Sequence, residues 1–417
     1  MTTLLLVQLL VILVVARGCG WVLRHFGQPP VIGEMAAGLL LGPIVFGAFA
    51  PELHASLFPA GSLAPLAALA TFGLILFMFI VGAEMRPIEG PRAQVRAAGA
   101  VGLLGISMPL ALGLAVSPLL YPRYAPDGLA FWPFALFLAA ALSVTAFPVL
   151  ARILKDRGLT HTRPGQLALS AAVIDDAFVW IFLAVVLTFS GGTGEYGVAV
   201  IAAGAVLLVA IVFLLLKPLY ARLLKAGTGE DGPGQRALVA VMVGLLACTA
   251  FAEAIGLHAV FGAFVFGACL PRDNGLLAYL RRTFEPLAML VLMPIVFALA
   301  GLNTTPDAFT GAGPGALALI LLVAIAGKLL GGMAGARISG YGWRDSFAVG
   351  SLINARGLME LIVLKIGLDA GLVGPELFTM LFAMAIVTTL MTAPLLALWA
   401  RRNAAAVPAG GHRGRLR

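Results

Sequence analysis

Long apolar runs follow one another along almost the whole sequence, and they limit the folds that it can adopt. A helix needs about 20 apolar residues to cross the roughly 30 Å hydrocarbon core of a bilayer. Thirteen runs approach that length: 3–23, 29–48, 61–83, 97–119, 129–151, 166–190, 197–217, 236–253, 256–271, 284–301, 315–336, 344–366 and 375–400. A chain that is 61% hydrophobic and 11% charged cannot bury its apolar surface in a soluble core. The sequence therefore predicts an all-α polytopic membrane protein with about thirteen transmembrane helices.

The formal net charge of +8 is explained by where the basic residues lie. All but four of the 27 lysines and arginines fall at the ends of odd-numbered runs or in the C-terminal tail; the exceptions are Arg123, Lys328, Arg356 and Lys365. Basic residues accumulate in cytoplasmic loops, so the pattern predicts an outside N-terminus and a cytoplasmic C-terminus in the cell's inner (plasma) membrane. The basic loops then face the anionic inner leaflet, and no nucleic-acid partner is expected.

Two adjacent carboxylates, Asp175 and Asp176, lie near the middle of the sixth run. Asp175 is about 14 Å into that run at 1.5 Å per residue, and Lys328 lies at the same depth in the eleventh run, which points the other way. Neighbouring helix positions point about 100° apart, so one aspartate can pair with Lys328 while the other faces a cavity. Charges at this depth are costly and usually functional. The alternatives are a buried structural hydrogen-bond network and a snorkelling lysine.

Two further runs contain residues that interrupt a helix. The fifth reads "ALSVTAFPVLARIL", in which Pro148 removes a backbone donor and clashes with the carbonyl of Val144. Ser143 and Thr145 add hydroxyl groups there. The twelfth reads "SLINARGLMELIVL", which places Asn354, Arg356 and Gly357 in mid-span. Irregular backbone at this depth persists only where it is buried or lines water. Taken singly, each break could also be a kink in a packing helix.

The two interruptions occupy matching places in the sequence. Each lies in the fifth of six consecutive runs, and the seventh run inverts the second set of six. Matching breaks in inverted halves indicate a transporter binding site at the bilayer midplane. We expect one membrane transport domain, 1–417, with a first inverted repeat (1–190), a linking helix and loop (191–235), a second inverted repeat (236–400) and a cytoplasmic tail (401–417).

Four other polar residues lie at or near the membrane. Glu84 ends the third run and is either an entrance carboxylate or a helix-end charge. Glu360 follows Arg356 by one helical turn and is expected to pair with it if the helix has resumed there. Glu34 is expected to be structural, and His258 is expected to be a packing residue rather than a proton sensor.

Five segments together resemble the monovalent cation/proton antiporters, in particular the second branch of that superfamily with the Kef-type and plant cation/proton exchangers. They are "GQPPVIGEMAAGLLLGP", "SVTAFPVLARIL", "AAVIDDAFVWIFLA", "GLHAVFGAFVFGACLPR" and "NARGLMELIVL". The resemblance implies two inverted six-helix repeats with crossed, discontinuous helices, a homodimer, and an elevator-like movement of the core domain. Kef-type potassium-efflux members also carry a C-terminal sensing domain, and no such segment follows residue 400 here, so that regulation is not expected.

The resemblance also implies roles for individual residues. Asp176 is similar to the carboxylate that binds cation and proton in turn, with Thr145 and nearby backbone as further ligands of Na⁺ or K⁺. Asp175 is similar to its neighbour that pairs with the core lysine, here Lys328. Arg356 resembles the arginine of the second unwound helix. Further candidates for the site are Ser143, Glu84, Asn354 and Glu360.

The function expected is secondary antiport of a monovalent cation against protons; neither an enzymatic activity nor a resident cofactor is expected. Na⁺ is favoured over K⁺, exchange is expected to be electrogenic, and the role is pH homeostasis. A K⁺/H⁺ antiporter of the potassium-efflux type and a cation channel are the alternatives. An intramembrane aspartyl protease is disfavoured because its two aspartates must face each other from different helices.

Overall fold

The computed structural model describes residues 2–84, 92–160, 162–189, 198–226, 228–229, 232–233, 235–255, 257–271 and 274–404. The first half of the described chain forms α1 (Thr2–His25), α2 (Pro30–Leu41), η1 (Pro43–Gly47), α3 (Pro51–Leu57), η2 (Ala60–Ser62), α4 (Leu63–Glu84), α5 (Arg92–Tyr124), α6 (Phe131–Ser143), α7 (Phe147–Asp156) and α8 (Arg163–Phe189). These elements account for the first six apolar runs, and α3 is a short additional helix between the second and the third.

The second half begins with α9 (Val198–Ala210), η3 (Ile211–Leu216) and α10 (Lys217–Ala226), which follow one another directly. A pair of two-residue strands, β1 (Thr228–Gly229) and β2 (Gly232–Pro233), lies in the loop that follows. The remaining elements are α11 (Gln235–Ala254), α12 (Ala259–Cys269), α13 (Asn274–Leu287), η4 (Ala288–Leu292), α14 (Met293–Leu302), η5 (Pro306–Phe309), α15 (Gly313–Ile338), α16 (Trp343–Ile353), α17 (Leu358–Asp369) and α18 (Pro375–Ala404).

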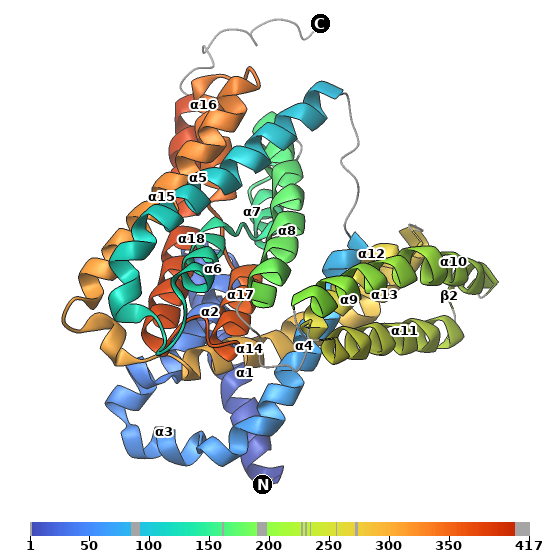
Figure 1. Cartoon of the computed structure of the whole chain (residues 1–417), viewed down its shortest axis with the longest axis horizontal. Helices are drawn as coiled ribbons and strands as arrows, with labels where there is room; N and C mark the ends of the chain where they lie inside the picture. Colours follow the sequence, from blue (N-terminus) through green and yellow to red (C-terminus); the bar gives the residue numbers. More distant parts are fainter. Residues whose placement is uncertain are drawn as a thin grey trace, which may run out of the picture.

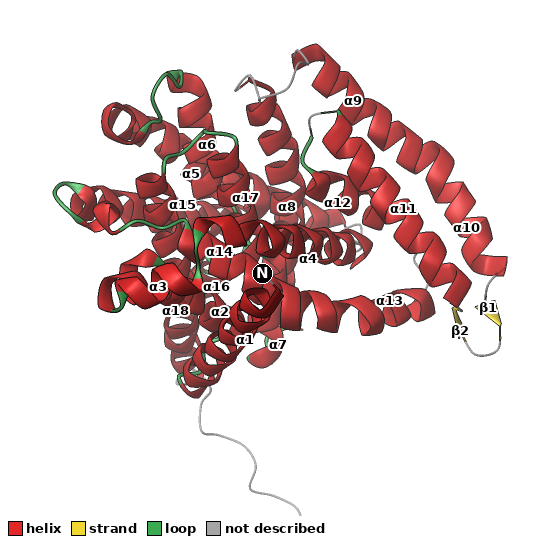
Figure 2. Ribbon diagram, turned by 90° about the horizontal axis from the view of Figure 1, so that it is seen from below, coloured by secondary structure: helices red, strands yellow, loops and turns green. Residues whose placement is uncertain are grey.

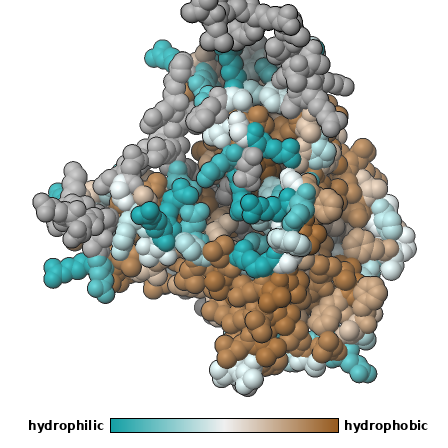
Figure 3. Space-filling model, turned by 180° about the vertical axis from the view of Figure 1, so that it is seen from behind, coloured by the Kyte–Doolittle hydropathy of each residue, from teal (hydrophilic) through white to brown (hydrophobic). Residues whose placement is uncertain are grey.

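The all-α prediction is confirmed. Within the described ranges, nine helical segments are long and apolar enough to cross a membrane, and α6 and α12 are shorter apolar helices. The fifth and twelfth runs are each divided between two helices, α6 with α7 and α16 with α17. Exposed apolar side chains, such as Leu6, Leu10 and Val14 of α1, point outward as lipid-facing residues do, and Figure 3 shows a broad apolar surface.

The helices pack in two groups. In one, α5 packs on α6, α8 and α15, and α16 packs on α8, α15 and α18. In the other, α2 packs on α1 and α14, while α4 packs on α12, α13 and α14. Figure 1 shows α5, α15 and α16 on one side of the molecule, with α9, α10 and α11 projecting on the other. Figure 2 shows the same separation from below. The groups meet at three places. From the first group, α18 contacts α2, α17 contacts α14, and α8 contacts α9, which lies beside the second group.

Glycine allows the closest of these helix contacts. A Cβ atom placed on Gly301 of α14 would lie 1.8 Å from the carbonyl oxygen of Gly38 on α2. No side chain fits in that space, so the backbones of α2 and α14 touch directly. Small residues at such crossings are typical of membrane helix pairs, in which close packing replaces the hydrophobic effect.

We therefore expect Gly301→Ala to separate α2 from α14 and to lower the thermal unfolding temperature of the detergent-solubilised protein strongly. The matched control is Gly99→Ala in α5, where a Cβ would meet nothing within 4 Å. Alanine there should be neutral or stabilising by up to about 1 kcal/mol because it favours the helix. Equal unfolding temperatures for the two variants would contradict the contact.

Candidate functional site

The two interrupted helices meet at their breaks. The chain between α6 and α7 is extended, with φ −62° and ψ 138° at Val144 and φ −92° and ψ 94° at Ala146. Pro148 falls in the first turn of α7, where its missing N–H costs nothing. The N–H of Ala146 donates to the carbonyl of Ala355, between α16 and α17, at 3.1 Å. The predicted breaks are thus present, and each supplies a hydrogen-bond partner to the other.

The buried pair of Asp175 and Lys328 lies beside this crossing. Lys328 Nζ on α15 is 2.9 Å from Asp175 Oδ2 on α8, and the two side chains are 0% and 1% exposed. Lys328 Nζ also donates to Thr145 Oγ1 at 2.6 Å. The hydroxyl of Thr145, with one proton to donate, lies 2.5 Å from Asp175 Oδ2 and 3.1 Å from the carbonyl oxygen of Ile353. Thr145 therefore links the first break, the ion pair and the end of α16.

Asp176 has a different environment from its neighbour. Asp176 is 2% exposed, and its carboxylate faces the backbone N–H of Phe147, the first residue of α7. That end of a helix carries partial positive charge and favours a carboxylate. Oδ1 of Asp176, like Oδ1 of Asp175, has no hydrogen-bond partner, but none of the ion pairs in the described part of the chain involves Asp176. An oxygen of this kind is available for a proton or a cation.

Arg356 holds the two broken helices together from the other side. Its guanidinium donates to the carbonyls of Ala141 at 2.9 Å and Leu142 at 2.5 Å, in the last turn of α6. These carbonyls have no partner within their helix, and the guanidinium compensates the negative end of the helix dipole. Arg356 also pairs with Glu360 at 3.2 Å, and both side chains are fully buried. The pairing expected one turn along α17 is therefore present.

The other candidates have hydrogen-bond or ion-pair partners other than the two aspartates. Ser143 Oγ bonds the carbonyl oxygens of Ala139 and Ile106, and Glu84 pairs with Arg281 at 2.9 Å. Asn354 Nδ2 donates to the carbonyl of Thr388, while its buried Oδ1 has no partner.

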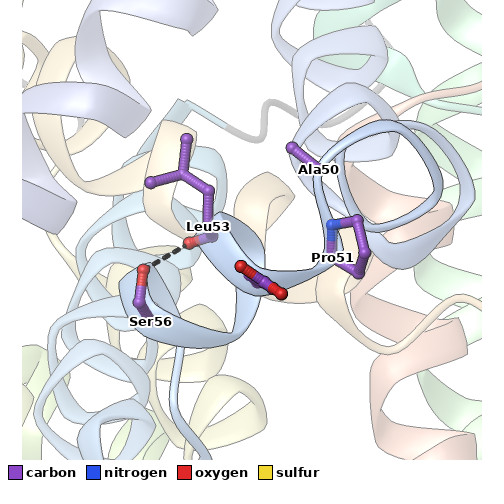
Figure 4. A pocket seen from close by; sticks show the side chains of 5 residues that line it. Ala50, Pro51, Leu53 and Ser56 are labelled. Carbon is purple, nitrogen blue, oxygen red and sulfur yellow. Dashed lines mark hydrogen bonds between the residues drawn. The ribbon is translucent and has the colours of Figure 1, made fainter.

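The remaining polar residues have local partners. Glu34 pairs with Arg17 at 3.3 Å, and His258 caps α12, where its Nδ1 accepts from the N–H of Val260. A hollow of about 690 Å³ at α3, lined by Ala50, Pro51, Glu52, Leu53 and Ser56 (Figure 4), contains none of the candidate residues.

Sequence reasoning did not identify Thr389 of α18. Its hydroxyl accepts from the N–H of Arg356 at 2.9 Å, and its one proton is within reach of the carbonyl oxygens of Arg356 at 2.8 Å and Ala385 at 2.7 Å. A threonine in an apolar helix gives no signal of this role, because the role depends on which irregular segment passes beside it.

The family model described as "Sodium/hydrogen exchanger, transmembrane" matches residues 10–399. The chain belongs to this family. It is 37% identical to the Na⁺/H⁺ antiporter NhaS4 of Synechocystis over 94% of this chain and 96% of that protein. It is 30% identical to the Na⁺/H⁺-K⁺ antiporter GerN of Bacillus cereus, over 93% of this chain and 94% of that one.

Other relatives are longer, and a solved structure shares the fold. The chain is 36% identical to cation/H⁺ antiporter 17 of Arabidopsis thaliana over 94% of its own length, but it spans only 48% of that relative. The structure of the sodium proton antiporter MjNhaP1 from Methanocaldococcus jannaschii superposes with a TM-score of 0.67, covering 98% of this chain and 100% of that one at 17% identity.

We expect Lys328→Ala to leave Asp175 as an uncompensated buried charge and to lower the free energy of unfolding by about 3–5 kcal/mol. The double variant Asp175→Asn/Lys328→Gln should lose clearly less, because neither partner remains charged. Lys365→Ala is the control: that lysine is 31% exposed and pairs with Asp369, so its removal should cost at most about 1 kcal/mol. Thermal unfolding in detergent measures all three, and a double variant as unstable as Lys328→Ala would contradict the pairing.

Proposed function

We propose that the protein is a secondary antiporter that exchanges a monovalent cation for protons at Asp176. The observation that carries this proposal is the contrast between two neighbouring carboxylates. Both carboxylates are buried and each has an Oδ1 without a hydrogen-bond partner, but Asp175 is neutralised by Lys328, whereas no ion pair among the described residues involves Asp176. The names of the relatives, which include Na⁺/H⁺, K⁺/H⁺ and cation/H⁺ antiporters, support the same class of activity.

Exchange follows from competition for one group. Burial disfavours an empty, charged carboxylate, while a bound cation favours the charged form. A proton or a cation on Asp176 therefore satisfies the same oxygen, and each excludes the other. The N–H of Phe147 supports the charged form when the cation is bound, since the start of α7 directs positive partial charge toward it.

The oxygen atoms of Asp176 and of the first break are of the kind that a hard cation binds. Asp176 Oδ1, the Thr145 hydroxyl and the carbonyls of the extended segment 144–146 are the proposed ligands. Thr145 now bonds Asp175 and Lys328, so its hydroxyl would have to turn toward the cation when one binds. We favour Na⁺ as the cation, and K⁺ is the second candidate because a relative named as a K⁺/H⁺ antiporter matches the chain at 33% identity.

The proposal includes alternating access. The group of helices that contains α5, α8, α15 and both breaks would move as a unit against the group that contains α2, α4 and α14, as in an elevator. We further propose a homodimer formed by the second group, an outside N-terminus and a location in the plasma membrane. The basic loops described above support this orientation. A cation channel is disfavoured because two paired discontinuous helices form an enclosed site rather than a filter.

We expect Asp176→Asn to abolish exchange while the protein still folds, because an amide keeps the shape but neither releases a proton nor balances a cation. The measurement is cation-driven proton flux in proteoliposomes, with Na⁺ and K⁺ supplied in turn. Asp345→Asn, at a half-buried position in the first turn of α16, is the matched control and should exchange at the wild-type rate. Flux near that rate in Asp176→Asn would refute the assignment, and cation movement without opposite proton movement would favour the channel.

We also expect exchange to be electrogenic, with about two protons per cation. A cation beside Asp176 repels the Lys328 ammonium and favours its deprotonation, in the same direction as burial does. Lys328 then releases one proton while Asp176 releases the other. Current recorded on a solid-supported membrane should rise when the imposed potential favours net charge movement. One-for-one exchange that is indifferent to voltage would refute this step and leave Asp175 and Lys328 as a structural pair.

A further inference from the structure

A cavity of about 570 Å³ lies between α7 and the continuous segment formed by α13 and η4. Its lining includes Arg152 from α7 on one side and Arg281, Arg282 and Glu285 from α13 on the other, with Met289 and Leu290 of η4. Three guanidinium groups from two separate elements therefore converge on one space with a partly apolar wall.

The three arginines differ in the ion pairs and hydrogen bonds that they already form. Arg281 pairs with Glu84 at 2.9 Å and with Glu285 at 3.0 Å, so its charge is compensated. Arg152 and Arg282 are exposed, and neither has a hydrogen bond or an ion pair with any residue that the structure describes. Two guanidinium groups are thus left as donors on opposite sides of the cavity.

The apolar part of the lining continues onto the outer surface of the helix. Leu287 and Leu290 are 44% and 51% exposed, as residues that face acyl chains are. The basic residues of α7 and α13 also lie between apolar runs of the sequence, in segments whose basic residues predict a cytoplasmic location. The cavity therefore combines a cationic end with an apolar end at the expected boundary of the inner leaflet.

We propose that this cavity binds a phosphate group, held between Arg152 and Arg282. Guanidinium groups match phosphate oxygens with two parallel hydrogen bonds, and basic pockets between membrane helices on the cytoplasmic side suit anionic headgroups. The apolar wall favours an anionic phospholipid as the source of the phosphate. A soluble phosphate compound is the other source of the same chemistry.

Binding there would connect the two groups of helices. Arg152 belongs to α7, whose first N–H contacts Asp176, whereas α13 packs on α4 in the other group. A phosphate that contacts both would stabilise the arrangement in which α7 and α13 face each other, because a ligand favours the state that it binds better. This inference needs no particular transported cation.

The test is thermal unfolding in nanodiscs of phosphatidylcholine alone or of equal parts phosphatidylcholine and phosphatidylglycerol. We expect phosphatidylglycerol to raise the unfolding temperature of the wild type, and Arg152→Gln/Arg282→Gln to lose that increase. The control Arg222→Gln/Arg344→Gln removes two exposed arginines outside the cavity and should keep it. Inorganic pyrophosphate added to phosphatidylcholine nanodiscs is the second arm, and stabilisation only there would assign the site to a soluble phosphate.

No stabilisation in either arm, or equal losses in the two double variants, would overturn the proposal. If the cavity variant does not fold, photolabelling of the wild type alone still tests the proposal. Photoreactive phosphatidylglycerol should label peptides containing Arg152 or Arg282, with competition by unlabelled phosphatidylglycerol or by pyrophosphate according to the source. Labelling that is absent from both peptides, or that neither competitor reduces, would overturn it. Because both readouts report binding, they remain informative if the antiport proposal fails.

Discussion

The ion pair between Asp175 and Lys328 is the interaction on which the arrangement of the core depends. It joins α8 to α15 in a region where both side chains are removed from solvent, and Thr145 extends it to the break between α6 and α7. Breaking such a pair from one side leaves a buried charge at a cost of about 3–5 kcal/mol. Three segments far apart in the sequence are therefore held at one depth by a single cluster of polar contacts.

The unwound segments remain stable because each free helix end has a partner. The last carbonyls of α6 accept from Arg356, and the first N–H of α7 faces Asp176. On the other break, Thr389 of α18 bonds both backbone groups of Arg356. Without these contacts, each break would expose unpaired backbone groups to an apolar surrounding. The contacts that stabilise the breaks are thus also those that orient the charged residues.

The sequence was sufficient for the fold class, the two breaks and the pairing at matched depth, because these follow from run length, Pro148 and the rise of a helix. It could not supply contacts that depend on how the segments cross. The carbonyls that Arg356 binds, the role of Thr389 and the direct contact of Gly38 with Gly301 all belong to this kind. The position of the Thr145 hydroxyl on Asp175 rather than on Asp176 depends on the same crossing, and no spacing along the chain indicates it.

The charges in the core determine which groups can hold or release a proton during exchange. Asp175 with Lys328 and Arg356 with Glu360 form two neutral pairs, and none of the ion pairs among the described residues involves Asp176; in the proposed exchange, its charge is balanced by the ion that it binds. A proton or a cation removes that imbalance, whereas an empty carboxylate crossing an apolar surrounding keeps it, so the empty carrier is the disfavoured one. If net charge moves, one of the neutral pairs must also give up a proton. Lys328 is the group able to do so, since a guanidinium such as that of Arg356 does not deprotonate in proteins.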